Sequence, residues 1–179
     1  MKRFIVVLLS AALLLTAGYS VWRVMTFDDQ STSVAGHPHY LNGRNIDQMK
    51  VVDKTGQSQV LSKLLTGDIN IINFWASWCE PCNREMPELV NYYHQKPNHI
   101  QVIGMNIQDE HKNRDAFIKK YHADYPMLTA DATVRKQYKI NNLPTTLFVD
   151  NNGKVLKTYL GEMNEQKLNA LIQQIEEGN

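Results

Sequence analysis

Cys79 and Cys82 are the two cysteines of the chain, and only two residues separate them. A disulfide between them closes a very small loop, which removes little entropy from the unfolded chain, so a purely structural bond is poorly favoured. The same spacing suits thiol–disulfide exchange. In that chemistry Cys79 attacks the disulfide of another protein, and Cys82 then attacks Cys79 to release the reduced partner.

A metal site is the main alternative for this pair, because His94 and His99 follow it in the sequence. The interval between Cys82 and His94 is slightly shorter than zinc fingers use, and Pro97 would interrupt a helix carrying both histidines. We therefore expect no metal site, and no cofactor other than the redox-active cysteine pair itself.

The residues around the pair predict a strand that leads into a helix. Ile69–Trp75 is a mostly apolar run, which is typical of a central strand covered on both faces, and a helix should extend from about Cys79 to Tyr93. Cys79 then lies at the helix N-terminus, where free backbone N–H groups and the helix dipole stabilise a thiolate. Pro81 suits the first turn of such a helix, because its missing N–H would have no helical acceptor there.

Strand-like and helix-like segments alternate through the rest of the chain. The expected elements are a hairpin within 49–60, a buried strand at 100–107, helices near 113–122 and 131–140, a hairpin of 145–150 with 154–160, and a helix at 164–178. This order predicts an α/β domain with helices flanking a mixed sheet. The formal net charge of +1 provides no strong field for nucleic acid, which we do not expect as a partner.

The N-terminus has the pattern of a membrane anchor. Lys2 and Arg3 precede an apolar stretch over residues 4–24, which is roughly long enough to span a bilayer as a helix. A cleaved signal peptide is the alternative, with a weak cleavage site after Ser20. The length of the stretch and the weakness of that site favour an uncleaved anchor.

These patterns divide the chain into three parts. We expect a signal-anchor that forms a single transmembrane helix over 1–26, a polar linker over 27–45 and a catalytic domain over 46–179. Basic residues near a first membrane span tend to stay in the cytoplasm, so the domain should face the extracytoplasmic side of the cell membrane. A cysteine pair in that oxidising location requires a supply of electrons to stay reduced.

The stretches FWASWCEPC and NLPTTLFVD resemble active-site segments of the thioredoxin superfamily, and the chain is most similar to the membrane-anchored ResA/TlpA-like thioredoxins. The resemblance covers about Met49 to Asn179. It implies a thioredoxin-like fold with an N-terminal β-hairpin extension and a central helical insertion near 108–130. It also implies a cis-proline at Pro144 that faces the cysteines. The implied client-binding residues are Trp78, Glu80, Pro81, Leu143 and Pro144.

The resemblance also draws attention to two polar positions. Ordinary thioredoxins have a buried aspartate where this chain has Asn73, and ResA-like proteins have a glutamate where it has Glu85. Glu85 lies three residues after Cys82, on the same side of the predicted helix, and is expected to take the proton-transfer role. The alternative is a partly exposed helix glutamate with no catalytic part.

Carboxylates beside the cysteines indicate the direction of exchange. Glu80 and Glu85 should raise the pKa of the thiols by like-charge repulsion, which disfavours the reduced pair and favours a reductant. The resemblance to ResA-like proteins implies reduction of the disulfide in apocytochrome c before haem attachment, with electrons from a CcdA-like membrane protein. The alternatives are a sporulation-type or general extracytoplasmic thioredoxin with other disulfide clients, and a non-catalytic thioredoxin-fold binding module.

Overall fold

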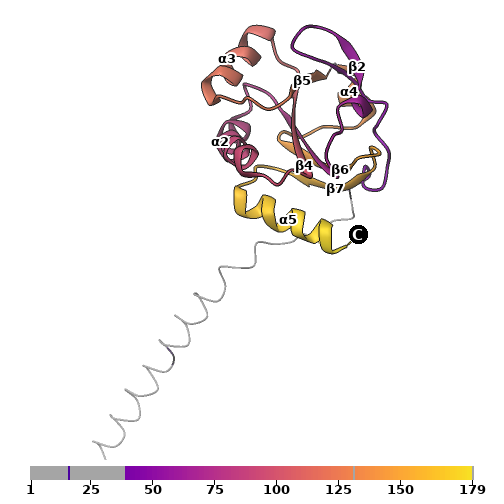
Figure 1. Ribbon diagram of the computed structural model, residues 1–179. Helices are drawn as coiled ribbons and strands as arrows, with labels where there is room; N and C mark the ends of the chain where they lie inside the picture. Colours follow the sequence, from indigo (N-terminus) through magenta and orange to yellow (C-terminus); the bar gives the residue numbers. More distant parts are fainter. Residues whose placement is uncertain (1–15, 17–38, 131, 179) are drawn as a thin grey trace, which may run out of the picture. The chain divides into compact units, whose positions relative to one another are not determined.

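Figure 1 shows the computed structural model of the chain, which describes Thr16 and residues 39–130 and 132–178. Except for Thr16, the predicted membrane anchor over 1–26 lies outside these residues. Within the described residues there is no helix both long enough and apolar enough to cross a bilayer. The elements that position the cysteines all lie after residue 39.

A seven-stranded mixed sheet forms the centre of this fold. Its strands are β1 (Lys50–Val52), β2 (Ser58–Val60), β3 (Ile69–Trp75), β4 (Ile100–Ile107), β5 (Met127–Ala130), β6 (Thr145–Asp150) and β7 (Val155–Leu160), in the spatial order β2-β1-β5-β4-β3-β6-β7. β3 pairs in parallel with β4 and antiparallel with β6, and every residue of β3 is buried. The strand before the cysteines is thus held on both edges and covered on both faces.

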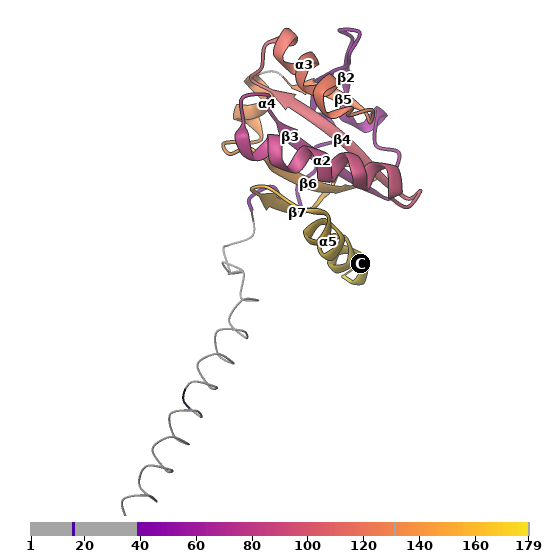
Figure 2. The same cartoon turned by 90° about the vertical axis from the view of Figure 1, so that its left-hand side faces the viewer.

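Three helices cover one face of the sheet, the face turned toward the viewer in Figure 2. They are α2 (Glu80–Gln95), α3 (His111–Tyr121) and α5 (Glu165–Glu177). Their apolar side chains, among them Met86, Phe117 and Leu168, share one core with β3. A second core on the opposite face is closed by α4 (Ala132–Gln137), the short helix η1 (Leu61–Lys63) and the segment before β1.

Most of the elements predicted from the sequence are confirmed, including both hairpins and the C-terminal helix. Asn164 is the N-cap of α5, and its side chain accepts a hydrogen bond from the Lys167 N–H at 2.8 Å. Gly153 closes the β6–β7 turn with φ +86°, and a Cβ there would meet the Cβ of Asp47 at 2.6 Å. Both the left-handed backbone and the close approach therefore require glycine at this turn.

Two segments differ from the sequence-based expectation. Residues 127–130, inside the expected helical insertion, form β5. This strand has only four residues, and buried and half-buried positions alternate along it, so its sequence gives only a weak strand pattern. Leu41, in the expected linker, is buried in the second core, and the neighbouring Gly43 N–H donates to the carbonyl of Val155 at 2.7 Å. The packed fold therefore includes residues before position 46.

Candidate active site

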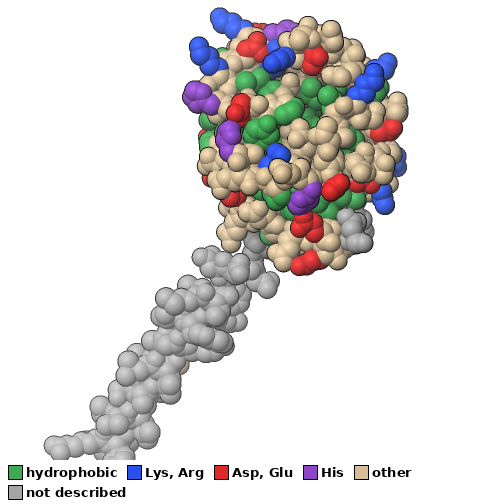
Figure 3. All heavy atoms as spheres, in the orientation of Figure 1, with side chains coloured by type: hydrophobic (Ala, Val, Ile, Leu, Met, Phe, Trp, Pro, Cys, Tyr) green, Lys and Arg blue, Asp and Glu red, His purple; other side chains and the backbone are tan. Residues whose placement is uncertain are grey.

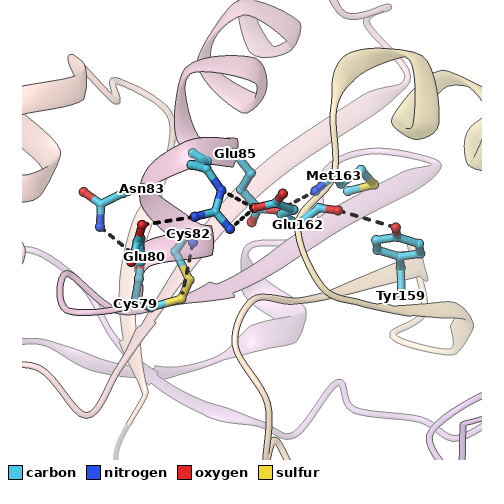
Figure 4. A network of polar contacts seen from close by, with 9 residues as sticks. Cys79, Glu80, Cys82, Asn83, Glu85, Tyr159, Glu162 and Met163 are labelled. Atoms are coloured by element: carbon cyan, nitrogen blue, oxygen red, sulfur yellow. Dashed lines mark hydrogen bonds and ion pairs between the residues drawn. A yellow bond between two sulfur atoms is a disulfide. The ribbon is translucent and has the colours of Figure 1, made fainter.

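The first cysteine stands at the junction of β3 and α2. Cys79 is the N-cap of α2, and its sulfur accepts a hydrogen bond from the Cys82 N–H at 3.3 Å. The two cysteines are joined in a disulfide, drawn in yellow in Figure 4. Cys79 thus lies at the helix N-terminus, as predicted, with Pro81 in the first turn. Once reduced, its sulfur would face the helix dipole and free N–H groups that stabilise a thiolate.

Cys79 lines a surface hollow of about 340 Å³. The other residues that line it are Trp78, Glu80, Pro81, Gln108, Arg135, Asn141, Asn142 and Leu143. The peptide bond between Leu143 and Pro144 is cis, and the Pro144 carbonyl accepts a hydrogen bond from the Gly161 N–H at 2.9 Å. The fold therefore brings Leu143 beside the cysteine from a distant part of the sequence, whereas Pro144 itself does not line the hollow.

Two large apolar side chains are exposed, one next to Cys79 in the sequence and one on the strand that pairs with β6. Trp78 has 62% of its surface accessible, and its indole N–H donates to the Gln108 carbonyl at 2.9 Å. Leu160, at the end of β7, is 48% accessible and pairs with Thr145, the residue after the cis-proline. An exposed apolar side chain beside a reactive group, as Trp78 is beside Cys79, is suited to contact with a partner protein. Nothing in the sequence pattern singled out Leu160, because only the strand pairing brings it to this loop.

A carboxylate at the end of the neighbouring strand anchors the loop before the cysteines. Asp109 follows β4, and its oxygens accept hydrogen bonds from the Ser77 backbone N–H at 2.6 Å and the Ser77 hydroxyl at 2.7 Å. The Asn106 side chain donates a third hydrogen bond to Asp109 at 3.1 Å. Asp109 was not predicted from the sequence. Its position just after a buried strand was the available signal, because parallel β3 and β4 end at the same edge of the sheet.

Glu85 lies on the buried face of α2, one turn after Cys82, with only 2% of its surface exposed. One carboxylate oxygen accepts a hydrogen bond from Asn73 Nδ2 at 2.6 Å. The other accepts one from the Met163 backbone N–H at 3.0 Å, which Figure 4 shows. Burial raises the pKa of Glu85 to about 7, and the two hydrogen bonds oppose that rise. A carboxyl group that is half-protonated near neutral pH is suited to accept and return a proton.

The surroundings of Glu85 also include the second hydrogen bond of Asn73 and the phenol of Tyr125. Asn73 Nδ2 also donates to the Thr146 hydroxyl at 3.0 Å, which ties the amide to β6. Tyr125 donates to Met86 Sδ at 3.0 Å, and its pKa is raised by burial and then by the negative charge of Glu85. The Tyr125 phenol therefore stays protonated at neutral pH, and Glu85 is the group that titrates there.

Glu80 lies on the exposed side of the same helix, with 86% of its side chain accessible. Arg84 is 3.4 Å from Glu80 through Nη1 and 2.7 Å from Glu162 through Nη2, so the three side chains form a small surface network (Figure 4). The sequence suggested that Glu80 and Glu85 both oppose a thiolate. Solvent and Arg84 screen the charge of Glu80, so this effect rests mainly on the buried Glu85.

The two histidines considered as zinc ligands make separate surface contacts. His94 is in the last turn of α2, at the opposite end from Cys79, and lies 3.5 Å from Asp124, while His99 is 2.9 Å from Glu176. Figure 3 shows histidine, acidic and basic side chains interspersed over the face in view. Among residues 39–130 and 132–178, no three His, Cys, Asp or Glu side chains are grouped to hold a metal ion.

Comparison with known proteins places this geometry in context. The redoxin family profile matches residues 41–172, which include the cysteine pair and the cis-proline. The thiol-disulfide oxidoreductase ResA of Bacillus subtilis is 29% identical over 168 residues, covering 93% of this chain and 89% of that protein. Sporulation thiol-disulfide oxidoreductase A of Bacillus subtilis is 28% identical over 120 residues, covering 64% and 73%.

A solved structure of a related protein has the same fold as this chain. The thioredoxin-related protein from Neisseria meningitidis serogroup B is 26% identical, with a TM-score of 0.61, over 71% of this chain and 98% of that one. The predicted thioredoxin-like fold is thereby confirmed. In proteins of this kind a cysteine pair at the start of a helix, rather than a bound cofactor, carries the redox chemistry.

Proposed function

Because the chain belongs to the redoxin family and is a thiol-disulfide oxidoreductase, we propose that it reduces the disulfide of apocytochrome c haem-binding cysteines outside the cytoplasm. The observation that carries this proposal is the similarity to ResA over 93% of the chain. Similarity to the sporulation oxidoreductase covers 64% of the chain, which supports the alternative set of clients less strongly.

In the proposed reaction the reduced protein gives two electrons to its client. The Cys79 thiolate attacks one sulfur of the client disulfide, so that a Cys79–client bond forms, the client S–S bond breaks and the other client sulfur leaves as a thiolate. Cys82 then loses its proton to Glu85 and attacks the Cys79 sulfur. This step forms the Cys79–Cys82 disulfide and releases the second client thiolate, and the two client thiolates take up protons.

The surroundings of Glu85 support the reducing direction. A buried carboxylate one turn from Cys82 opposes a second negative charge in the same place, which raises the pKa of the thiol and disfavours the reduced pair. A pair whose reduced form is destabilised donates electrons more readily. We expect a reduction potential near that of thioredoxin, about −270 mV, and far from that of strong periplasmic oxidants, about −120 mV.

The location and the electron donor belong to the same proposal. We propose that residues 1–26 hold the chain in the cell membrane by a single span, that the residues between this span and the packed domain link the two, and that the domain faces the extracytoplasmic side. The order of basic and apolar residues at the N-terminus supports this arrangement. A CcdA-like membrane protein would return electrons to the Cys79–Cys82 disulfide after each cycle.

Trapping of clients in cells tests the proposal. In a full-length Cys82→Ala variant the mixed disulfide through Cys79 is not resolved, so its partners accumulate and are identified by mass spectrometry. We expect c-type cytochrome precursors among them, and none from the Cys79→Ser, Cys82→Ala double variant. Capture of other clients without cytochrome precursors would support the sporulation-type or general alternative. Full function of Cys79→Ser in cells would instead support the non-catalytic binding module.

A further inference from the structure

The hollow beside Cys79 has a basic side chain in its wall. Arg135 belongs to α4, which packs on the face of the sheet opposite α2, yet it lines the same hollow as Cys79 and Leu143. The side chain is half-buried. A client disulfide that reaches Cys79 must enter this hollow, so the residues next to the attacked client cysteine come close to Arg135.

The Arg135 side chain is held in place by the turn that follows α4. Its Nε–H donates to the Ile140 carbonyl at 3.1 Å, and the Ile140 N–H donates to the Arg135 carbonyl at 3.0 Å. Ile140 is anchored in the second core with 2% of its surface exposed, and Lys139 closes the turn with φ 49°. The guanidinium is thus oriented before any client arrives, which reduces the entropy lost on binding.

The acidic residue in the wall of the hollow does not pair with Arg135. Within residues 39–130 and 132–178, the Arg135 side chain makes one hydrogen bond, through Nε to the Ile140 carbonyl. Glu80, the acidic residue in the wall of the same hollow, is paired with Arg84. A guanidinium binds a carboxylate through two parallel hydrogen bonds.

We propose that Arg135 is a specificity-determining residue of the client site and pairs with an acidic side chain that flanks the client cysteine attacked by Cys79. The inference rests on the thiol–disulfide exchange described above and names a chemical class of client. Clients with Glu or Asp beside the disulfide are attacked faster than clients with neutral or basic residues there.

Single-turnover attack by Cys79 tests this in the full chain, in a Cys82→Ala background where the mixed disulfide persists. The probes are synthetic peptides with one intramolecular Cys-x-x-Cys disulfide, flanked on both sides by Glu, Gln or Lys. We expect the Glu peptide to react about tenfold faster than the Gln peptide, which corresponds to one charge-assisted hydrogen-bonded contact. The Lys peptide should be slowest.

Variants separate this contact from a structural effect. Arg135→Gln should remove the preference for Glu, so that the Glu and Gln peptides react at similar rates, and Arg135→Lys should restore part of the preference. Lys136→Gln removes an exposed charge from the same helix outside the hollow and should change neither rate. Equal Glu and Gln rates in the Cys82→Ala background, or a preference that survives Arg135→Gln, would overturn the proposal. Failure of the Gln peptide to react at all would count against the exchange chemistry instead.

Discussion

Two glutamates on the first turns of α2 carry the same charge in the sequence but behave differently in the fold. Glu80 is exposed and paired with Arg84, whereas Glu85 is buried and accepts hydrogen bonds from Asn73 and Met163. Water and a cation screen the first carboxylate, while burial makes the second a group that titrates near pH 7. A carboxylate that is close to a redox pair in the sequence therefore does not necessarily affect the pKa of the cysteines.

The largest expected effect is the one that the buried Glu85 has on the pH dependence of stability. The folded state raises the pKa of Glu85 from 4.5 to about 7, so it holds the proton more tightly than the unfolded chain does. Glu85 therefore contributes most below pH 4.5, and its contribution falls by about 3 kcal/mol as the pH rises to about 7.

Denaturant unfolding at a series of pH values measures this effect. The free energy of unfolding of the wild type, relative to that of Glu85→Gln, should decline across the interval. A constant difference between wild type and Glu85→Gln would show that Glu85 has its ordinary pKa in the folded protein.

The second difference is in the rate of exchange. Glu85→Gln should slow the attack of Cys82 on a mixed disulfide roughly 100-fold at pH 7, because the proton acceptor is lost. Glu80→Gln, a matched change on the solvent side of the helix, should change the rate less than about twofold. Stopped-flow fluorescence of the tryptophans reports the step. Similar rates for the two variants would remove Glu85 from the mechanism.

Asn73 provides a smaller test of the buried carboxylate. Asn73→Ala removes the donor that holds Glu85 at 2.6 Å, so the pKa of Glu85 should rise and the pH–rate inflection should move to higher pH. The protein should also lose roughly 1–2 kcal/mol of stability, because a buried acceptor loses its partner. Thr146→Val removes only the other acceptor of Asn73 and should leave the inflection nearly unchanged. An equal shift in both variants would contradict this assignment.

The smallest effect is expected on the surface. Arg84→Gln breaks the contacts with Glu80 and Glu162, but all three side chains are about half exposed or more. The loss in the free energy of unfolding should therefore stay below about 1 kcal/mol and shrink in high salt. A loss above about 2 kcal/mol, measured by chemical denaturation, would mean that this network is more than a solvated ion pair.

Local patterns made most of the fold predictable. The apolar run of β3, the turn of β6–β7 and the helical periodicity of α5 are short-range signals, and each element formed near its expected position. β5 was missed because its pairing with β4 and β1, rather than its own four residues, makes it a strand. The sequence predicted Leu41 to be part of a linker because its neighbours are polar. In the structure it packs in a core formed by residues that are distant in the sequence.

In the active site, too, some features could be predicted from the sequence and others could not. Cys79, Cys82 and the start of α2 are adjacent in the chain, so the sequence alone determined the redox pair, its place at a helix N-terminus and the class of chemistry. Asp109 and Arg135 reach the site only through strand pairing and helix packing, and strand pairing alone brings Leu160 beside Thr145. Tertiary structure also decided that Glu85 is buried and Glu80 is exposed. Burial and hydrogen-bond partners set the pKa of a carboxyl group, and for Glu85 both come from segments far away in the sequence.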